Sequence, residues 1–136
     1  MHKLTRMPQK TPIVLPNIDP PKSPYSAGIV CGDMVFVSGQ GPIDVSTKQI
    51  VGATIEEQVE LTIKNVERIL NAAGCTLADV VKSTVHLLNI ADFDRFNAVY
   101  RRMFPEPFPA RTTVQSVLWG GILVEIDVIA VKSKNN

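Results

Sequence analysis

The chain has 136 residues, 45% of them hydrophobic and 20% charged, and its 14 basic and 13 acidic side chains leave a formal net charge of +1. This length and composition predict one soluble globular domain, and the near-zero charge argues against a nucleic-acid partner. No apolar run is long enough to span a bilayer, and no signal-peptide pattern is present. We therefore expect a cytoplasmic protein with no membrane partner.

Prolines are concentrated at the beginning of the chain. Residues 1–24 hold six of the ten prolines, so this segment is predicted to be an extended N-terminal arm, and residues 25–133 a single domain. The segment AGIVCGDMVFVSGQ then contains two β-rich runs on either side of Gly32-Asp33. Such a break between apolar runs predicts a hairpin of two strands.

Two helices are predicted from apolar residues at helical spacing. The first follows a capping box formed by Thr54 and Glu57 and stops at Gly74. The second begins near Asp92 and ends before Pro105. Between the two, the segment VVKSTVHLL is rich in β-branched residues and is predicted to be a strand.

The last third of the chain predicts two more strands, ARTTVQSVL and ILVEIDVIAVK, joined as a hairpin through Trp119-Gly120-Gly121. The resulting order β-β-α-β-α-β-β favours an α+β fold, a mixed sheet with both helices on one face. One face of the final strand is wholly apolar and should meet the helices: Ile122, Val124, Ile126, Val128 and Ala130. The opposite face carries Glu125 and Asp127 among apolar residues, and another copy of the chain is expected to cover it.

Arg111 begins an otherwise uncharged strand, where a cation is either incidental or holds an anion. If the Trp-Gly-Gly loop has three residues, Glu125 lies on the same face as Arg111 and opposite Gln115, whereas a two-residue loop reverses this relation. Even in the favourable register the two charges are separated by on the order of 13 Å. A small substrate could contact both only if the site is shared between neighbouring chains.

No metal site is expected from the sequence. Cys31 and Cys75 are far apart and form no CxxC motif, so each is interpreted as a buried thiol. His86 lies in an apolar strand run and is interpreted as a packed or hydrogen-bonded histidine. These residues offer no credible ligand set for zinc or iron.

The segment PARTTVQSVLWGGILVEIDVIAV resembles the C-terminal signature of the Rid (YjgF) family, in which Pro-Ala-Arg opens one strand and an apolar-Glu-Ile step occupies the next. The resemblance extends through SPYSAGIVCGDMVFVSGQGP, QVELTIKNVERILNAAGCTLADVVKSTVHL and DFDRFNAVYRRMF. It covers nearly everything after about residue 20, in the family's order. It implies a chorismate-mutase-like α+β domain that forms a homotrimer with clefts between subunits.

The resemblance also implies an activity: hydrolytic deamination of reactive enamines and imines, such as 2-aminoacrylate, to 2-keto acids and ammonia without a cofactor. The enzyme would be similar to a 2-iminobutanoate/2-iminopropanoate deaminase. Arg111 matches the arginine that holds the substrate carboxylate, and Glu125 matches the glutamate near the attacking water. The remaining matches predict substrate-binding positions: Tyr25, Ser38, Gly39 and Asn97.

Two departures from the family pattern concern the substrate. Thr113, which we keep among the substrate-binding positions, stands where the archetypes have a cysteine, and SVLWGG replaces a leucine-proline turn. A specific catabolic substrate such as 2-aminomuconate, a non-catalytic metabolite-binding role and a ribonuclease-like role therefore stay open. In the structural alternative, Arg111 caps carbonyls of a neighbouring chain and Glu125 pairs with a lysine.

Overall fold

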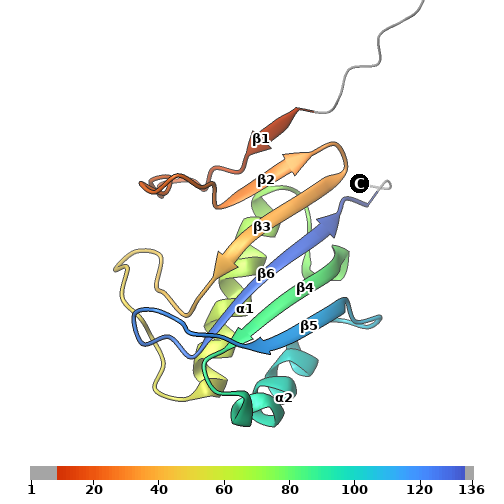
Figure 1. Ribbon diagram of the computed structural model, residues 1–136. Helices are drawn as coiled ribbons and strands as arrows, with labels where there is room; N and C mark the ends of the chain where they lie inside the picture. The colour runs from red at the N-terminus through yellow and green to blue at the C-terminus, as the bar shows by residue number, and fades with distance from the viewer. Residues whose placement is uncertain (1–8, 134–136) are drawn as a thin grey trace, which may run out of the picture.

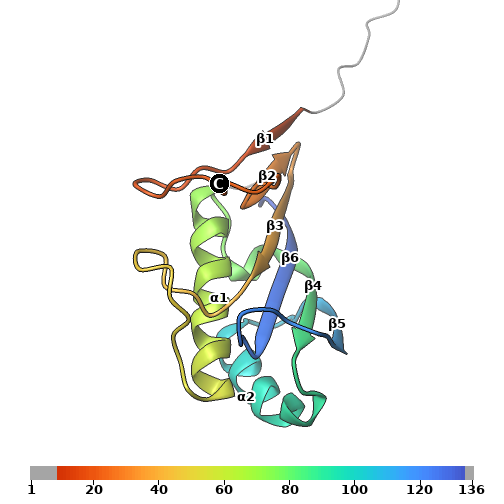
Figure 2. The same cartoon turned by 60° about the vertical axis from the view of Figure 1, so that its left-hand side comes forward.

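Two helices pack on one face of a six-stranded sheet in the computed structural model, which describes residues 9–133 (Figures 1 and 2). The strands are β1 (Lys10–Pro12), β2 (Gly28–Cys31), β3 (Met34–Gln40), β4 (Val80–Leu87), β5 (Ala110–Gln115) and β6 (Val124–Val131). The helices are α1 (Ile55–Ala72) and α2 (Phe93–Met103), with 3₁₀ turns η1 (Leu77–Asp79) and η2 (Ile90–Asp92). The strand order is β1-β2-β3-β6-β4-β5, and only the β4–β5 pair is parallel. The predicted α+β class with helices on one face is confirmed.

Helix α1 begins and ends at the residues that the sequence predicts. The side chain of Thr54 accepts a hydrogen bond from the Glu57 backbone N–H at 3.2 Å, which satisfies one of the free donors of the first turn. At the other end, Gly74 has a φ of +80°, a conformation that glycine adopts without strain. The chain reverses there, and the Cys75 N–H reaches the carbonyl of Leu70 at 2.9 Å.

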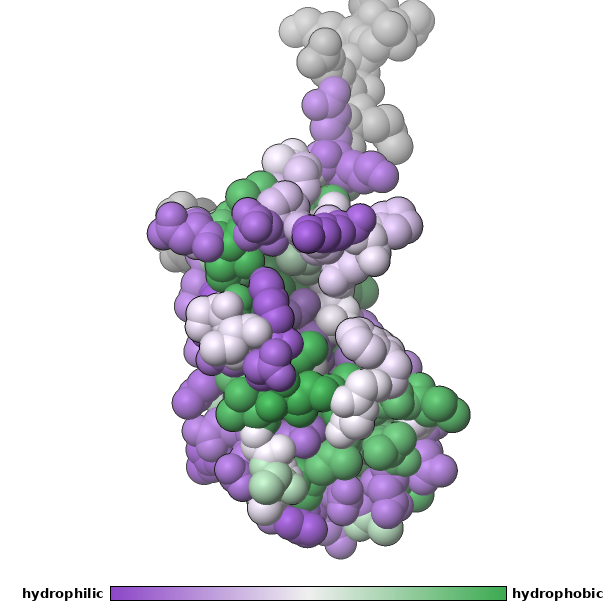
Figure 3. Space-filling view, turned by 90° about the vertical axis from the view of Figure 1, so that its left-hand side faces the viewer, coloured by the Kyte–Doolittle hydropathy of each residue, from purple (hydrophilic) through white to green (hydrophobic). Residues whose placement is uncertain are grey.

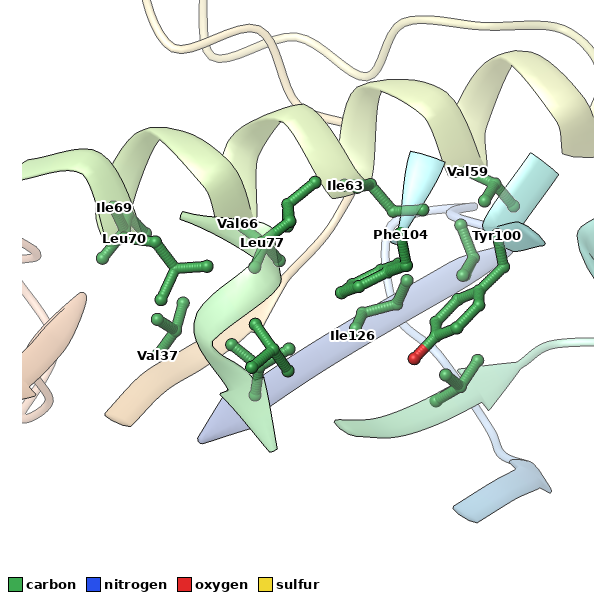
Figure 4. Close-up of a cluster of buried hydrophobic side chains, with 14 of the residues drawn as sticks. Val37, Val59, Ile63, Val66, Ile69, Leu70, Leu77, Tyr100, Phe104 and Ile126 are labelled. Carbon is green, nitrogen blue, oxygen red and sulfur yellow. The ribbon is translucent and has the colours of Figure 1, made fainter. Parts of the chain in front are cut away.

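The core lies between the helices and the sheet (Figure 4). Val37 of β3 and Ile126 of β6 point toward α1, as the alternation along each strand requires. The five positions of the apolar face predicted for the last strand are all buried. On α2, Tyr100 is buried and its hydroxyl shares a 2.7 Å hydrogen bond with Ser83 of β4. This bond ties α2 to the strand beside β5.

The predicted hairpin of the last two strands is wrong. β5 runs parallel to β4 at one edge of the sheet, while β6 lies between β3 and β4. Every second residue of β6 is buried up to Ala130, which suits a central strand, whereas no residue of β5 is fully buried. Glu125 therefore pairs with His86 of β4 and not with Gln115.

The other face of the sheet is covered by no element of the described chain (Figure 2). It carries Met34, Phe36 and Val131, with 41%, 37% and 40% of their surface exposed. The expected arm contributes β1, which pairs with β2 at the far edge of the sheet. The division of the chain at residue 24 stays a prediction, and residues 1–8 of the arm lie outside the described part.

The cap of α1 can be tested by removing its hydroxyl. Thr54→Ala leaves the Glu57 N–H without its partner and should lower the free energy of unfolding by about 1 kcal/mol in urea titrations at fixed protein concentration. Thr54→Ser keeps the acceptor oxygen and should unfold at nearly the parental denaturant concentration. Equal destabilisation by both variants would show that the threonine methyl group, and not the cap, stabilises this end.

Candidate functional site

Arg111 lies near the start of β5 and faces the helices. It pairs with Ser83, whose side chain is buried under α2. The guanidinium carbon lies 4.7 Å from the ring centroid of Tyr100, 5.4 Å from that of Phe96 and 5.5 Å from that of Phe93. Aromatic faces attract a cation, so these rings hold the charge in place without neutralising it.

Among residues 9–133, Asn97 forms the one hydrogen bond to this guanidinium. Its Oδ1 accepts a hydrogen bond from Arg111 Nη1 at 2.9 Å. No carboxylate of residues 9–133 lies within 4.0 Å of Arg111. A guanidinium has five N–H donors, and this amide uses one of them. Arg111 is therefore an oriented cation with donors left for an anion.

A cavity of about 300 Å³ opens beside this guanidinium. It is lined by Asn97, Tyr100, Arg101, Phe108, Pro109 and Arg111. Apolar and aromatic walls with a few polar groups are typical of pockets for small organic ligands. The pocket is suited to a small molecule that carries a carboxylate.

Glu125, Gly39 and Ser38 form a second cluster, where β3 ends and β6 begins. A side chain at Gly39 would meet the carboxylate of Glu125, because an ideal Cβ would lie 2.6 Å from Oε1. The sequence predicts that this glycine lets a ligand approach, and in the structure Glu125 occupies that space. Ser38 donates a 2.6 Å hydrogen bond to the carbonyl of Ser26, next to the 58% exposed Tyr25.

The two clusters lie on opposite faces of the sheet. Arg111 points toward α2, whereas Glu125 alternates with the buried residues of β6 and lies on the open face. Two strand spacings and three residues along the ladder place their Cα atoms on the order of 14 Å apart. Neither of the two hairpin registers applies, because β5 and β6 both pair with β4 and not with each other. Arg111 and Glu125 of one chain therefore cannot hold the same small molecule.

Thr113 follows Arg111 on the same side of β5 and pairs with Val85. Its Oγ1 is buried and has no hydrogen-bond partner among the described residues. The sequence reasoning missed the pocket walls formed by Tyr100, Arg101 and Phe108. Arg101 could have been predicted from its spacing, because it follows Asn97 by four residues and residues four apart share one helix face.

The residues considered as metal ligands, His86, Cys31 and Cys75, can be located in the structure. His86 Nδ1 is hydrogen-bonded to Ser116 Oγ at 2.7 Å, which confirms the interpretation of a partner-bonded histidine. Cys75 is buried, and burial raises the pKa of its thiol, while Cys31 is half-buried. Residues 9–133 contain no group of three His, Cys, Asp or Glu side chains arranged to hold a metal ion. Within the same residues, neither helix is long and apolar enough to cross a bilayer.

Residues 17–132 match the protein family described as Endoribonuclease L-PSP. The chain belongs to the Rid (YjgF) family. It is 50% identical to a RutC family protein of Saccharolobus solfataricus over 83% of this chain and 90% of that protein. It is 37% identical to the human protein named 2-iminobutanoate/2-iminopropanoate deaminase over 80% of both chains. The crystal structure of the Escherichia coli YjgF gene product superposes with a TM-score of 0.83 at 35% identity, covering 90% of this chain and 99% of that one, which confirms the predicted Rid fold.

The contact between Gly39 and Glu125 predicts a selective effect of an added methyl group. In Gly39→Ala the new Cβ meets the end of a flexible side chain, so Glu125 should rotate away while the melting temperature changes little. In the matched variant Gly28→Ala, the Cβ meets Ile13, Ile69 and the backbone oxygen of Phe36 at 2.7, 2.9 and 3.0 Å. We expect this variant to lose about 1 to 3 kcal/mol.

Thermal unfolding and a crystal structure of Gly39→Ala measure the two effects separately. If Gly39→Ala unfolds as readily as Gly28→Ala, the glycine is needed for the backbone of β3 and not for the carboxylate.

Proposed function

We propose that this protein hydrolyses reactive imines and enamines that carry a carboxylate, giving 2-keto acids and ammonia without a cofactor. The observation that carries the proposal is the guanidinium of Arg111, oriented beside a cavity of about 300 Å³ without a carboxylate partner in the described chain. The human and bovine relatives named 2-iminobutanoate/2-iminopropanoate deaminase support the same reaction class.

Arg111 binds the substrate carboxylate in this proposal. A planar guanidinium grips a carboxylate through two parallel hydrogen bonds, and each charge-assisted bond contributes roughly 1.5 to 3 kcal/mol. Asn97 and the ring of Tyr100 fix the orientation of the guanidinium before the substrate arrives. Thr113 lies two residues further along β5 on the same side of the strand, and its buried hydroxyl has no partner among the described residues.

Glu125 acts on the attacking water. Its carboxylate accepts a proton from the water as the water oxygen bonds to the imine carbon, which gives a tetrahedral carbinolamine. That proton passes to the nitrogen, and the carboxylate then moves the hydroxyl proton to the same nitrogen. The carbon–nitrogen bond breaks, ammonia leaves, and the hydroxyl oxygen becomes the keto oxygen. Gly39 leaves room for the carboxylate, and Ser38 holds the segment that carries Tyr25 through its hydrogen bond to the Ser26 carbonyl.

The site is completed by assembly into a homotrimer. The open face of the sheet exposes Met34, Phe36 and Val131, and covering it with a second copy removes this apolar surface from water. Figure 3 shows further apolar surface at the end of the molecule where the 41–52 and 116–122 loops lie. The exposed Ile50 and Val117 belong to these loops. In a closed ring, β5 of one subunit approaches the Glu125 cluster of the next.

Three alternative functions differ in the residues or the substrate that they require. A ribonuclease needs a track of cations for phosphates, and the net charge of +1 offers weak support for one. A metabolite-binding protein without turnover needs Arg111 but not Glu125. A deaminase for a specific catabolic enamine, such as 2-aminomuconate, uses both residues and differs only in the substrate.

Substitutions at the two charges test the reaction. Arg111→Lys keeps the charge but not the planar fork and should lose most turnover of 2-aminoacrylate generated in situ, followed as keto-acid release. Arg111→Ala should lower kcat/KM about 10² to 10³-fold, because the substrate carboxylate loses its partner. Glu125→Gln should turn over slowly but still bind a stable keto acid, since the anion site is intact.

Calorimetry of keto-acid binding distinguishes the two roles. Arg111→Ala should bind the keto acid far more weakly than the parent, and Glu125→Gln should bind it nearly as well. If Arg111→Ala binds as tightly as the parent, the arginine is structural and the proposed site is wrong.

The assembly is tested by light scattering. We expect a particle with three times the mass of one chain at micromolar concentration, because an exposed apolar sheet face favours association. Introducing a charge at its centre, as in Phe36→Glu, should dissociate the particle, whereas Lys64→Glu on the exposed side of α1 should not. A monomeric parent protein would contradict the proposal.

A further inference from the structure

Resting on the proposed function, we propose that Arg101 forms a second anion subsite in the Arg111 pocket, so that the site prefers substrates with two carboxylates. Arg111 and Arg101 both line the cavity of about 300 Å³. A site for a monocarboxylic imine needs only the first of these cations. The second places positive charge where the remainder of the substrate would lie.

The other arginines near Arg101 are engaged with carboxylates. Arg95 forms a two-bond contact with Glu56 at 2.6 and 2.9 Å, and Arg102 reaches Glu60 at 3.5 Å. Arg101 has no carboxylate within 4.0 Å among residues 9–133. On α2, then, the two arginines that face away from the cavity are paired, and the one that lines it is not.

The position of Arg101 is set by two neighbours. It follows Asn97 by one helical turn, so the Cβ atoms of the two residues are about 6 Å apart along the same face of α2. Its guanidinium carbon lies 5.5 Å from the ring centroid of Phe108, which also lines the cavity. Asn97 in turn holds Arg111 at 2.9 Å. The two cations therefore line the same cavity, each held by a neighbour that also lines it.

The substrate class that fits is the set of imines formed from acidic amino acids. The carboxylate next to the imine carbon binds Arg111, and the side-chain carboxylate reaches Arg101. The hydrolysis is unchanged: water adds to the imine carbon, the nitrogen leaves as ammonia, and the product is a dicarboxylic 2-keto acid. Because Arg101 is exposed, we expect a preference of about 5- to 10-fold and not more.

Calorimetry with two stable keto acids tests this subsite directly. The parent should bind 2-oxoglutarate about 5- to 10-fold more tightly than 2-oxobutanoate, and Arg101→Gln should bring the two dissociation constants close together. Arg101→Glu should reverse the preference, because it places a like charge beside the second carboxylate. Arg102→Gln removes the same charge from the neighbouring residue outside the cavity and should keep the parental ratio.

The possible outcomes separate this inference from the proposed reaction. If the parent binds both keto acids equally, or neither, or if Arg102→Gln changes the ratio as much as Arg101→Gln, the subsite is wrong. Turnover is measured in parallel with imines generated from alanine and from aspartate. A preference for 2-oxoglutarate that Arg101→Gln abolishes, together with no turnover of either imine, would leave the subsite standing and contradict the hydrolysis.

Discussion

The site depends on how one permanent charge is held at the edge of the sheet. Arg111 is positioned by the ring of Tyr100 and by a single amide, that of Asn97, and no carboxylate of the described chain neutralises it. Half-buried charges are costly unless they are compensated, and aromatic faces compensate a cation only in part. The parallel pairing of β5 with β4 puts the arginine under α2, and the Tyr100–Ser83 bond fixes the helix that holds it. Packing in this region thus leaves an oriented cation without a carboxylate partner among the described residues.

The position of β6 explains why the proposed reaction requires a neighbouring chain. Insertion of β6 between β3 and β4 buries its apolar face and places Glu125 on the face that α1 and α2 leave open. The side chains of Glu125 and Arg111 then lie on opposite faces of the sheet, and β4 lies between the strands that carry them. Closure of a symmetric ring can bring the two charges together only from different subunits. In the proposed trimer, covering the exposed apolar face would in this way also assemble the site.

Local signals in the sequence predicted most of the fold, and non-local pairing accounts for what they missed. The cap at Thr54, the stop at Gly74 and the alternation along β6 depend on neighbouring residues, and all are confirmed. The predicted hairpin after β5 was wrong because the glycine-rich connection resembles a tight turn, whereas β6 lies in the centre of the sheet and pairs with β3 and β4. The pocket walls were missed because Phe108 and Arg101 meet only through the docking of α2 beside β5.

Mixed trimers test the shared site most directly. Arg111→Ala and Glu125→Gln chains are each expected to retain only slow turnover alone, but a mixed trimer contains boundaries where an intact Arg111 faces an intact Glu125. Random mixing of equal amounts after dissociation and reassembly should restore about a quarter of the parental deaminase activity, because each boundary draws one chain of each kind in the required order. A mixture that stays as slow as its components, although light scattering and tagged chains show that trimers have exchanged subunits, would contradict a site built from two chains.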